Sequence, residues 1–92
     1  MRNFDDYLSE ARRKTGVASN NGIAKLLDIS GPSLSSLFQG KSLPSEDTMV
    51  KLADLAGIDR ETALLDLAVW RSSGNENVKK TWLSLANKLA LL

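Results

Sequence analysis

The sequence predicts an all-α fold, a compact single domain over residues 1–92 with five to six helices. Apolar residues recur at the three- and four-residue spacing of helices from Phe4 to Leu89, and no segment alternates apolar and polar residues as a strand does. Glycines and prolines interrupt this pattern at short intervals, which indicates short connections between helices. With 42% hydrophobic and 25% charged residues, the composition is that of an ordinary globular protein rather than a disordered one.

Three helices are predicted in the first part of the chain, over residues 3–14, 20–28 and 32–40. Gly16 ends the first helix, whose acids lie near its positive end. Polar residues precede the second helix and can cap it by accepting hydrogen bonds from free backbone N–H groups. Pro32 suits the first position of the third helix, because an N–H group there has no helical partner.

Three further helices are predicted from Ser45 onward. Ser45 is the expected cap of a helix that stops at Gly57, and Asp59 is the expected cap of the next one. The helix after Asp59 is apolar on more than one face, so it needs cover on both sides. The polar loop 72–75 then leads to a last helix of roughly four turns with one apolar face.

Residue types that carry most enzyme and metal chemistry are missing. The chain has neither cysteine nor histidine, which excludes disulfides and zinc fingers, and it has no glycine-rich phosphate loop. The acid pairs Asp5–Asp6 and Glu46–Asp47 are at helix starts, where the helix dipole explains them. We therefore expect no enzyme activity, no metal ion, no cofactor and no small-molecule substrate.

The N-terminal segment is acidic where a secretory leader would be apolar, and no apolar run approaches the roughly 18 residues of a membrane span. We therefore expect a cytoplasmic protein with no membrane partner.

Positive charge is concentrated in one part of the chain, although the net charge is only +1. Residues 12–41 contain five basic residues against the single acid Asp28, whereas residues 45–92 contain six basic and seven acidic residues. The basic segment suits a phosphate backbone. Its cluster Arg12–Lys14 is a candidate for phosphate contact, but cations in the last turn of a helix are also favoured by the helix dipole alone.

Residues 20–39 have the pattern of a helix-turn-helix. Apolar residues at helical spacing lie on both sides of a segment, 28–32, that is poor in helix formers. Ala24 is small enough to let the two helices approach closely, and Leu34 and Leu37 offer apolar surface to it. In such a pair the first helix braces the second, whose outer face projects into the major groove of DNA.

Three motifs follow or overlap this pair: Leu37-Phe38-Gln39-Gly40-Lys41, Leu43-Pro44-Ser45 and Leu52-Ala53-Asp54-Leu55-Ala56-Gly57-Ile58. With Ala24 and Leu34, they make the segment from Ser19 to about Ile58 resemble the DNA-binding domain of lambda-repressor and Cro-type (XRE-like) phage regulators. The full chain is also similar to the small immunity repressors of filamentous Pseudomonas bacteriophages. The resemblance implies a helix-turn-helix DNA-binding core over residues 1–58 and C-terminal dimerisation helices over residues 59–92.

The chain departs from the family pattern in two places. Asp28 stands where the turn usually has glycine, although aspartate tolerates the left-handed conformation better than most residues. Family members often have glutamines that bind adenine at the start of the second motif helix, where this chain has Gly31, Pro32 and Ser33. The resemblance therefore implies sparse direct contact with bases.

The resemblance also implies which residues contact DNA. The expected base contacts are Gly31, Pro32, Ser33 and Ser36; a serine hydroxyl can donate or accept a hydrogen bond, and a proline can pack on a thymine methyl group. The expected phosphate contacts are Ser19, Asn20, Asn21, Ser30, Gln39, Lys41 and Ser42. The alternative for the serines is that they are only small solvated residues.

The two C-terminal helices contain more apolar surface than a small monomer should expose. We expect a dimer interface there, formed by Leu64, Leu67, Trp70, Trp82, Leu85 and Leu89. The alternative is that these residues complete the core of one monomer.

The sequence thus predicts a sequence-specific transcriptional repressor of a phage or prophage, which binds a palindromic operator in double-stranded DNA as a homodimer. Two alternatives remain. One is an antitoxin-type regulator whose last two helices cover a different protein. The other is a helical protein-interaction module that does not bind DNA.

Overall fold

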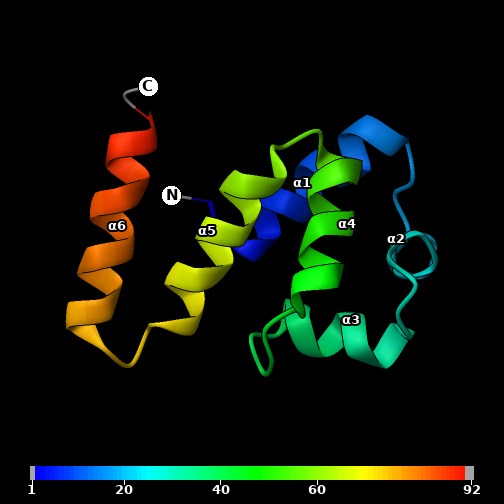
Figure 1. Ribbon diagram of the computed structural model, residues 1–92. Helices are drawn as coiled ribbons and strands as arrows, with labels where there is room; N and C mark the ends of the chain where they lie inside the picture. Colours follow the sequence, from blue (N-terminus) through cyan, green and yellow to red (C-terminus); the bar gives the residue numbers. More distant parts are fainter. Residues whose placement is uncertain (1, 91–92) are drawn as a thin grey trace.

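The computed structural model describes residues 2–90, which form a compact all-α globule (Figure 1). Its six helices are α1 (Phe4–Thr15), α2 (Asn20–Leu27), α3 (Gly31–Phe38), α4 (Glu46–Ala56), α5 (Arg60–Arg71) and α6 (Glu76–Ala90). No strand occurs in this part of the chain. The predicted fold class is confirmed, and each helix lies close to its predicted range.

Serine side chains cap three of these helices. Ser19, Ser30 and Ser45 accept hydrogen bonds from the backbone N–H groups three residues later, at 3.0, 3.2 and 3.2 Å. Each bond satisfies one of the free N–H groups of a first turn. Helix α1 has a reciprocal cap, in which the side chain of Asn3 and the side chain of Asp6 each accept from the other residue's backbone N–H at 2.9 Å.

Two details of the predicted caps need correction. Asp59 occupies the N-cap position of α5, but its side chain accepts no capping bond. The neighbouring Arg60 guanidinium ties this turn to α4 instead, donating to both carboxylate oxygens of Asp54 at 2.9 and 2.8 Å. Pro32 is the second residue of α3 rather than the first, because Gly31 already has helical geometry. A proline is tolerated at this position because the second N–H group of a helix also lacks a helical partner.

The turn between α2 and α3 depends on a left-handed residue. Asp28 has φ 58°, and it is the only non-glycine residue with positive φ in the described part of the chain. Its N–H donates to the Lys25 carbonyl at 3.1 Å, and the N–H of Ile29 donates to the Ala24 carbonyl at 3.0 Å. These bonds close α2, and α3 begins at Gly31, three residues after Asp28.

The core is formed by the first five helices around α4, which packs against α1, α2 and α5. The buried hydrophobic residues of this cluster are Tyr7, Leu8, Ala11, Ile23, Ala24, Leu27, Leu34, Met49, Leu52, Ala53, Ala56, Ala63 and Leu67. Helix α6 takes no part in the cluster and packs chiefly against α5, back along which it runs in Figure 1. No described helix is long and apolar enough to cross a membrane.

Candidate nucleic-acid interface

Helices α2 and α3 form a closely packed pair. Ala24 and Leu34 are each only 2% exposed, and Ile23 and Leu27 are fully buried against the rest of the core. The small side chain of Ala24 leaves room for α3, and the apolar residues fix the angle between the helices through contact with α1 and α4. The outer face of α3 therefore has a fixed position relative to the core.

The first turns of α2 and α3 lie next to each other. A Cβ atom added to Gly31, the first residue of α3, would lie 3.6 Å from the side-chain oxygen of Asn21 in the first turn of α2. Each first turn has a serine cap just before it and exposes the positive end of its helix dipole. Two adjacent helix N-termini favour an anion in front of them.

Two pairs of serine hydroxyls hold the polar side of α3 in place. Ser30 Oγ donates to Ser33 Oγ at 2.9 Å and accepts from the backbone N–H of Ser33. Ser36 Oγ and Ser42 Oγ are 3.0 Å apart and share a hydrogen bond. A hydroxyl can take part in up to three hydrogen bonds, so each of these groups can still bind a further partner.

The loop after α3 folds back onto the helix. Gly40 has φ 75°, a conformation that suits glycine, and the N–H of Lys41 donates to the Ser36 carbonyl at 3.0 Å. This bond keeps Ser42 near Ser36, while the side chains of Gln39 and Lys41 remain exposed. Loop and helix therefore present their polar groups together.

The residues expected to contact DNA are all accessible. Gly31 and Ser36 are partly buried, and the other nine are exposed, namely Ser19, Asn20, Asn21, Ser30, Pro32, Ser33, Gln39, Lys41 and Ser42. The structure thus brings the two helix starts together and joins the end of α3 to the loop that follows it. Phe38, which shares the helical spacing of Leu34 and Leu37, is 51% exposed rather than packed in the core.

The basic cluster at the end of α1 is divided between different partners. Arg12 donates through Nη2 to the side-chain oxygen of Asn20, which ties α1 to the start of α2. Arg13 instead forms an ion pair with Glu10 at 2.8 Å, and the hydrogen bond from Arg13 lowers the pKa of the Glu10 carboxyl. The side chain of Lys14 lies beside Gly57, at the end of α4.

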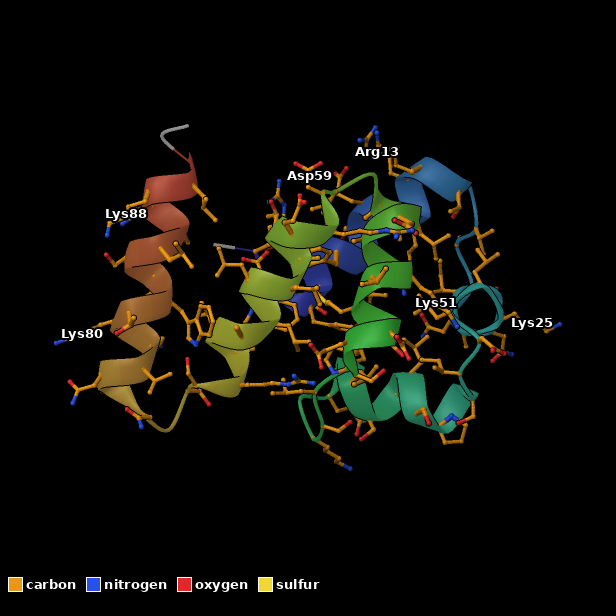
Figure 2. The ribbon with its side chains drawn as sticks, in the orientation of Figure 1. Arg13, Lys25, Lys51, Asp59, Lys80 and Lys88 are labelled. Carbon is orange, nitrogen blue, oxygen red and sulfur yellow. The ribbon has the colours of Figure 1, made fainter. Side chains whose placement is uncertain are left out.

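Of these three cations, Arg12 is therefore the one that contacts the predicted interface, through its hydrogen bond to Asn20. Helical spacing in the sequence does not reveal this contact. Lys25 extends from α2 into solvent, well apart from Arg13 (Figure 2).

A groove lies between α5 and α6, and we call it the α5–α6 groove. Its volume is about 680 Å³, and its apolar lining includes Leu64, Leu65 and Ala68 from α5 and Trp82, Leu85 and Leu89 from α6. Five of the six predicted interface residues line this groove, namely Leu64, Leu67, Trp82, Leu85 and Leu89.

Two of the predicted interface residues contact the core of the chain: Leu67, at the bottom of the groove, and Trp70, outside it. Leu67 is 1% exposed and belongs to the core of the chain itself, so it has no surface to offer to a partner. Trp70 packs edge-on against Tyr7, with the ring centroids 5.9 Å apart, and its indole N–H donates to the Arg2 carbonyl at 3.2 Å. These two residues anchor α5 to the core of one chain, which is the alternative that the sequence left open for them.

Comparisons with known proteins give no match: no protein-family model matches the chain, and no curated protein or solved structure matches it significantly. Within the described residues, no group of three or more acidic side chains is arranged to hold a metal ion.

Proposed function

We propose that this chain is a sequence-specific transcriptional repressor of phage or prophage origin, in which α2 and α3 form a helix-turn-helix of the lambda-repressor type. The observation that carries the proposal is the adjacency of the first turns of α2 and α3, with Asn21 beside Gly31 and the polar face of α3 exposed next to them. A phosphate group in front of both turns would place α3 in the major groove.

Affinity in this proposal comes mainly from the DNA backbone. Backbone N–H groups at the start of α2, together with Asn20 and Asn21, bind phosphate oxygens on one side of α3, and Gln39 and Lys41 bind them on the other. The hydrogen bond from Arg12 holds the Asn20 side chain in a fixed orientation before DNA arrives. Neutralised phosphates release counterions, so binding weakens as salt rises.

Base recognition rests on small side chains. Pro32, Ser33 and Ser36 can reach only a few base edges, and a serine hydroxyl discriminates weakly among hydrogen-bonding groups. Specificity therefore depends also on DNA shape at positions that the protein does not touch, and on the pairing of two half-sites by a homodimer. Such a dimer on a palindromic operator represses by occluding the promoter.

Selection from a pool of random 30-base-pair duplexes, followed by fluorescence anisotropy on the selected sequence, tests the proposal. We expect binding that falls steeply between about 50 and 200 mM salt. Lys41→Ala should weaken binding about equally for selected and unselected duplexes and reduce the salt slope by about one. Lys80→Ala, on the side of α6 that points away from the rest of the molecule, is the matched control (Figure 2). Absence of salt-sensitive duplex binding would refute the proposal.

A further inference from the structure

The dipeptide Asn21–Gly22 lies in the first turn of α2, and it is the only place in the sequence where an asparagine precedes a glycine. A backbone nitrogen can attack the side-chain amide carbon of an asparagine that precedes it. This attack is fastest when the nitrogen belongs to glycine, because no Cβ atom obstructs the approach. The side chain of Asn21 is also exposed, so water can reach it. Asn21 is therefore the asparagine of this chain that is chemically most susceptible to deamidation.

Packing requires a glycine at position 22. A Cβ atom added there would lie 2.4 Å from Cγ1 of Val17 and 2.9 Å from Oγ of Ser19, closer than Cβ atoms approach other heavy atoms in proteins. Val17 is itself packed against the hydrophobic core, so it has little room to move away. The fold thus keeps the glycine that makes Asn21 reactive.

The cap of α2 controls the access of the Gly22 nitrogen to Asn21. Ring closure needs Asn21 to leave its helical backbone conformation, so the first turn must open. Two hydrogen bonds to Ser19 keep this turn closed. The N–H of Gly22 donates to Ser19 Oγ at 3.0 Å, and the N–H of Ile23 donates to the Ser19 carbonyl at 3.1 Å. Opening of this serine-capped turn is therefore the structural event that limits the reaction.

We propose that Asn21 is a spontaneous deamidation site, that the Ser19 cap sets its rate, and that its conversion switches off DNA binding. The Gly22 nitrogen loses its proton and bonds to the side-chain amide carbon of Asn21, and the amide C–N bond breaks to release ammonia. Water then opens the cyclic imide and leaves aspartate or isoaspartate. The net reaction consumes one water, releases one ammonia and exchanges an amide for a carboxylate, without oxidation or reduction.

The aspartate product fits the fold but not the DNA. No acidic residue lies in the first turn of α2, so a carboxylate at position 21 would stabilise the positive end of the helix dipole. The same carboxylate would lie beside Gly31, in front of the expected phosphate position, where it repels phosphate and has no N–H group to donate. This consequence for DNA rests on the proposed function, whereas the chemistry at Asn21 does not.

Incubation of the full chain at pH 8, followed by protease digestion and mass spectrometry, tests the site. We expect Asn21 to lose its amide before the five asparagines that precede larger residues, namely Asn3, Asn20, Asn75, Asn77 and Asn87. Fragmentation of the peptide separates Asn21 from its neighbour. An amide at Asn21 that survives as long as the other five would overturn the proposed site.

A pair of cap variants tests the control by Ser19. Ser19→Ala should raise the deamidation rate about fivefold, because it removes the side-chain bond that holds the Gly22 N–H and closes the turn. Its matched control is Ser45→Ala, which removes the equivalent bond from the first turn of α4 and should leave the rate at Asn21 unchanged. Equal rates in the two variants would overturn the control by the cap.

Fluorescence anisotropy with the selected duplex tests the effect on DNA binding. Asn21→Asp should keep the circular dichroism spectrum of the wild type and bind at least about tenfold more weakly. Asn21→Gln keeps an amide but forms its larger imide ring far more slowly. Its duplex affinity should therefore stay constant during an incubation in which the wild type loses affinity.

The outcomes separate this inference from the proposed function. Deamidation of Asn21 that leaves duplex affinity unchanged would overturn the switch and leave the repressor function standing. Absence of duplex binding by the fresh wild type would refute the repressor function and the switch together, while the mass spectra would still decide the reaction at Asn21.

Discussion

The hydroxyl of Tyr7 in α1 donates a hydrogen bond to the carboxylate of Asp66 in α5, across 59 residues of sequence. Tyr7 is fully buried and Asp66 is 5% exposed, so the bond joins two helices inside the protein. Trp70, one turn further along α5, packs on the ring of the same tyrosine. Tyr7 thus joins α1 to α5 through two contacts, in addition to the packing of α5 on α4.

Removal of the tyrosine hydroxyl should destabilise this connection. We expect Tyr7→Phe to cost about 1–3 kcal/mol in free energy of unfolding, because it leaves a buried carboxylate without its hydrogen-bond donor. Urea denaturation followed by circular dichroism measures the change. An unfolding free energy equal to that of the wild type would show that the bond contributes nothing.

Asp66 should make stability depend on pH. Burial raises the pKa of its carboxyl above the ordinary value, although the hydrogen bond from Tyr7 and the charge of Arg2 act in the opposite direction. A raised folded-state pKa stabilises the fold fully below the unfolded-state value of about 4, and this stabilisation is lost as pH rises through the folded-state pKa. We therefore expect the contribution of Asp66 to the free energy of unfolding to fall as the pH rises from about 4 through the folded-state pKa.

Asp66→Asn should remove this pH dependence, since it keeps a hydrogen-bond acceptor for Tyr7 but carries no charge to bury. We expect the variant to be at least as stable as the wild type at pH 7. Thermal unfolding at a series of pH values from 4 to 8 compares the two proteins. A wild-type profile with the same slope as that of the variant would contradict the assignment to Asp66.

The turn between α2 and α3 offers a test of backbone strain. Asp28→Gly should stabilise the chain by up to about 1 kcal/mol, because glycine adopts the left-handed conformation at φ 58° without strain. The ion pair with Lys51 that it removes is long, 3.8 Å, and exposed, so its loss should count for little. Asp28→Val, which has a β-branched side chain, should destabilise the protein instead. Chemical denaturation measures the free energies of unfolding of the wild type and both variants. Equal values for the three proteins would show that the left-handed conformation at Asp28 is not strained.

The helices could be predicted from the sequence because their ends depend on local signals. Ser45 caps α4 and Gly57 closes it, each through bonds to residues at most four positions away. The Tyr7–Asp66 bond could not be predicted in this way, since helical spacing identifies a buried face but not the residue opposite it. An acid within the apolar run of α5 was the available signal.

The candidate site was predictable to a similar extent. Exposure of α3 and its loop follows from local polarity, but the contacts from Arg12 to Asn20 and between Ser36 and Ser42 depend on tertiary packing. Leu64 and Leu67 have the same residue type and lie three residues apart on a helix that is apolar on several faces. Both line the α5–α6 groove, but Leu67 is only 1% exposed because it also belongs to the core, a difference that depends on tertiary packing.

Ser30 and Ser33 have different roles in the structure, and paired variants should separate them. Ser30 caps α3 and also orients the Ser33 hydroxyl, so Ser30→Ala should cost about 1 kcal/mol of stability and also weaken operator binding. Ser33→Ala leaves the capping bond intact, because the donor of that bond is a backbone N–H. We therefore expect Ser33→Ala to keep the wild-type unfolding free energy and to lose part of its discrimination between selected and unselected duplexes. Urea denaturation and anisotropy on the same preparations measure both effects. If Ser33→Ala retained full discrimination, base contact by this hydroxyl would be excluded and specificity would rest on DNA shape and half-site spacing.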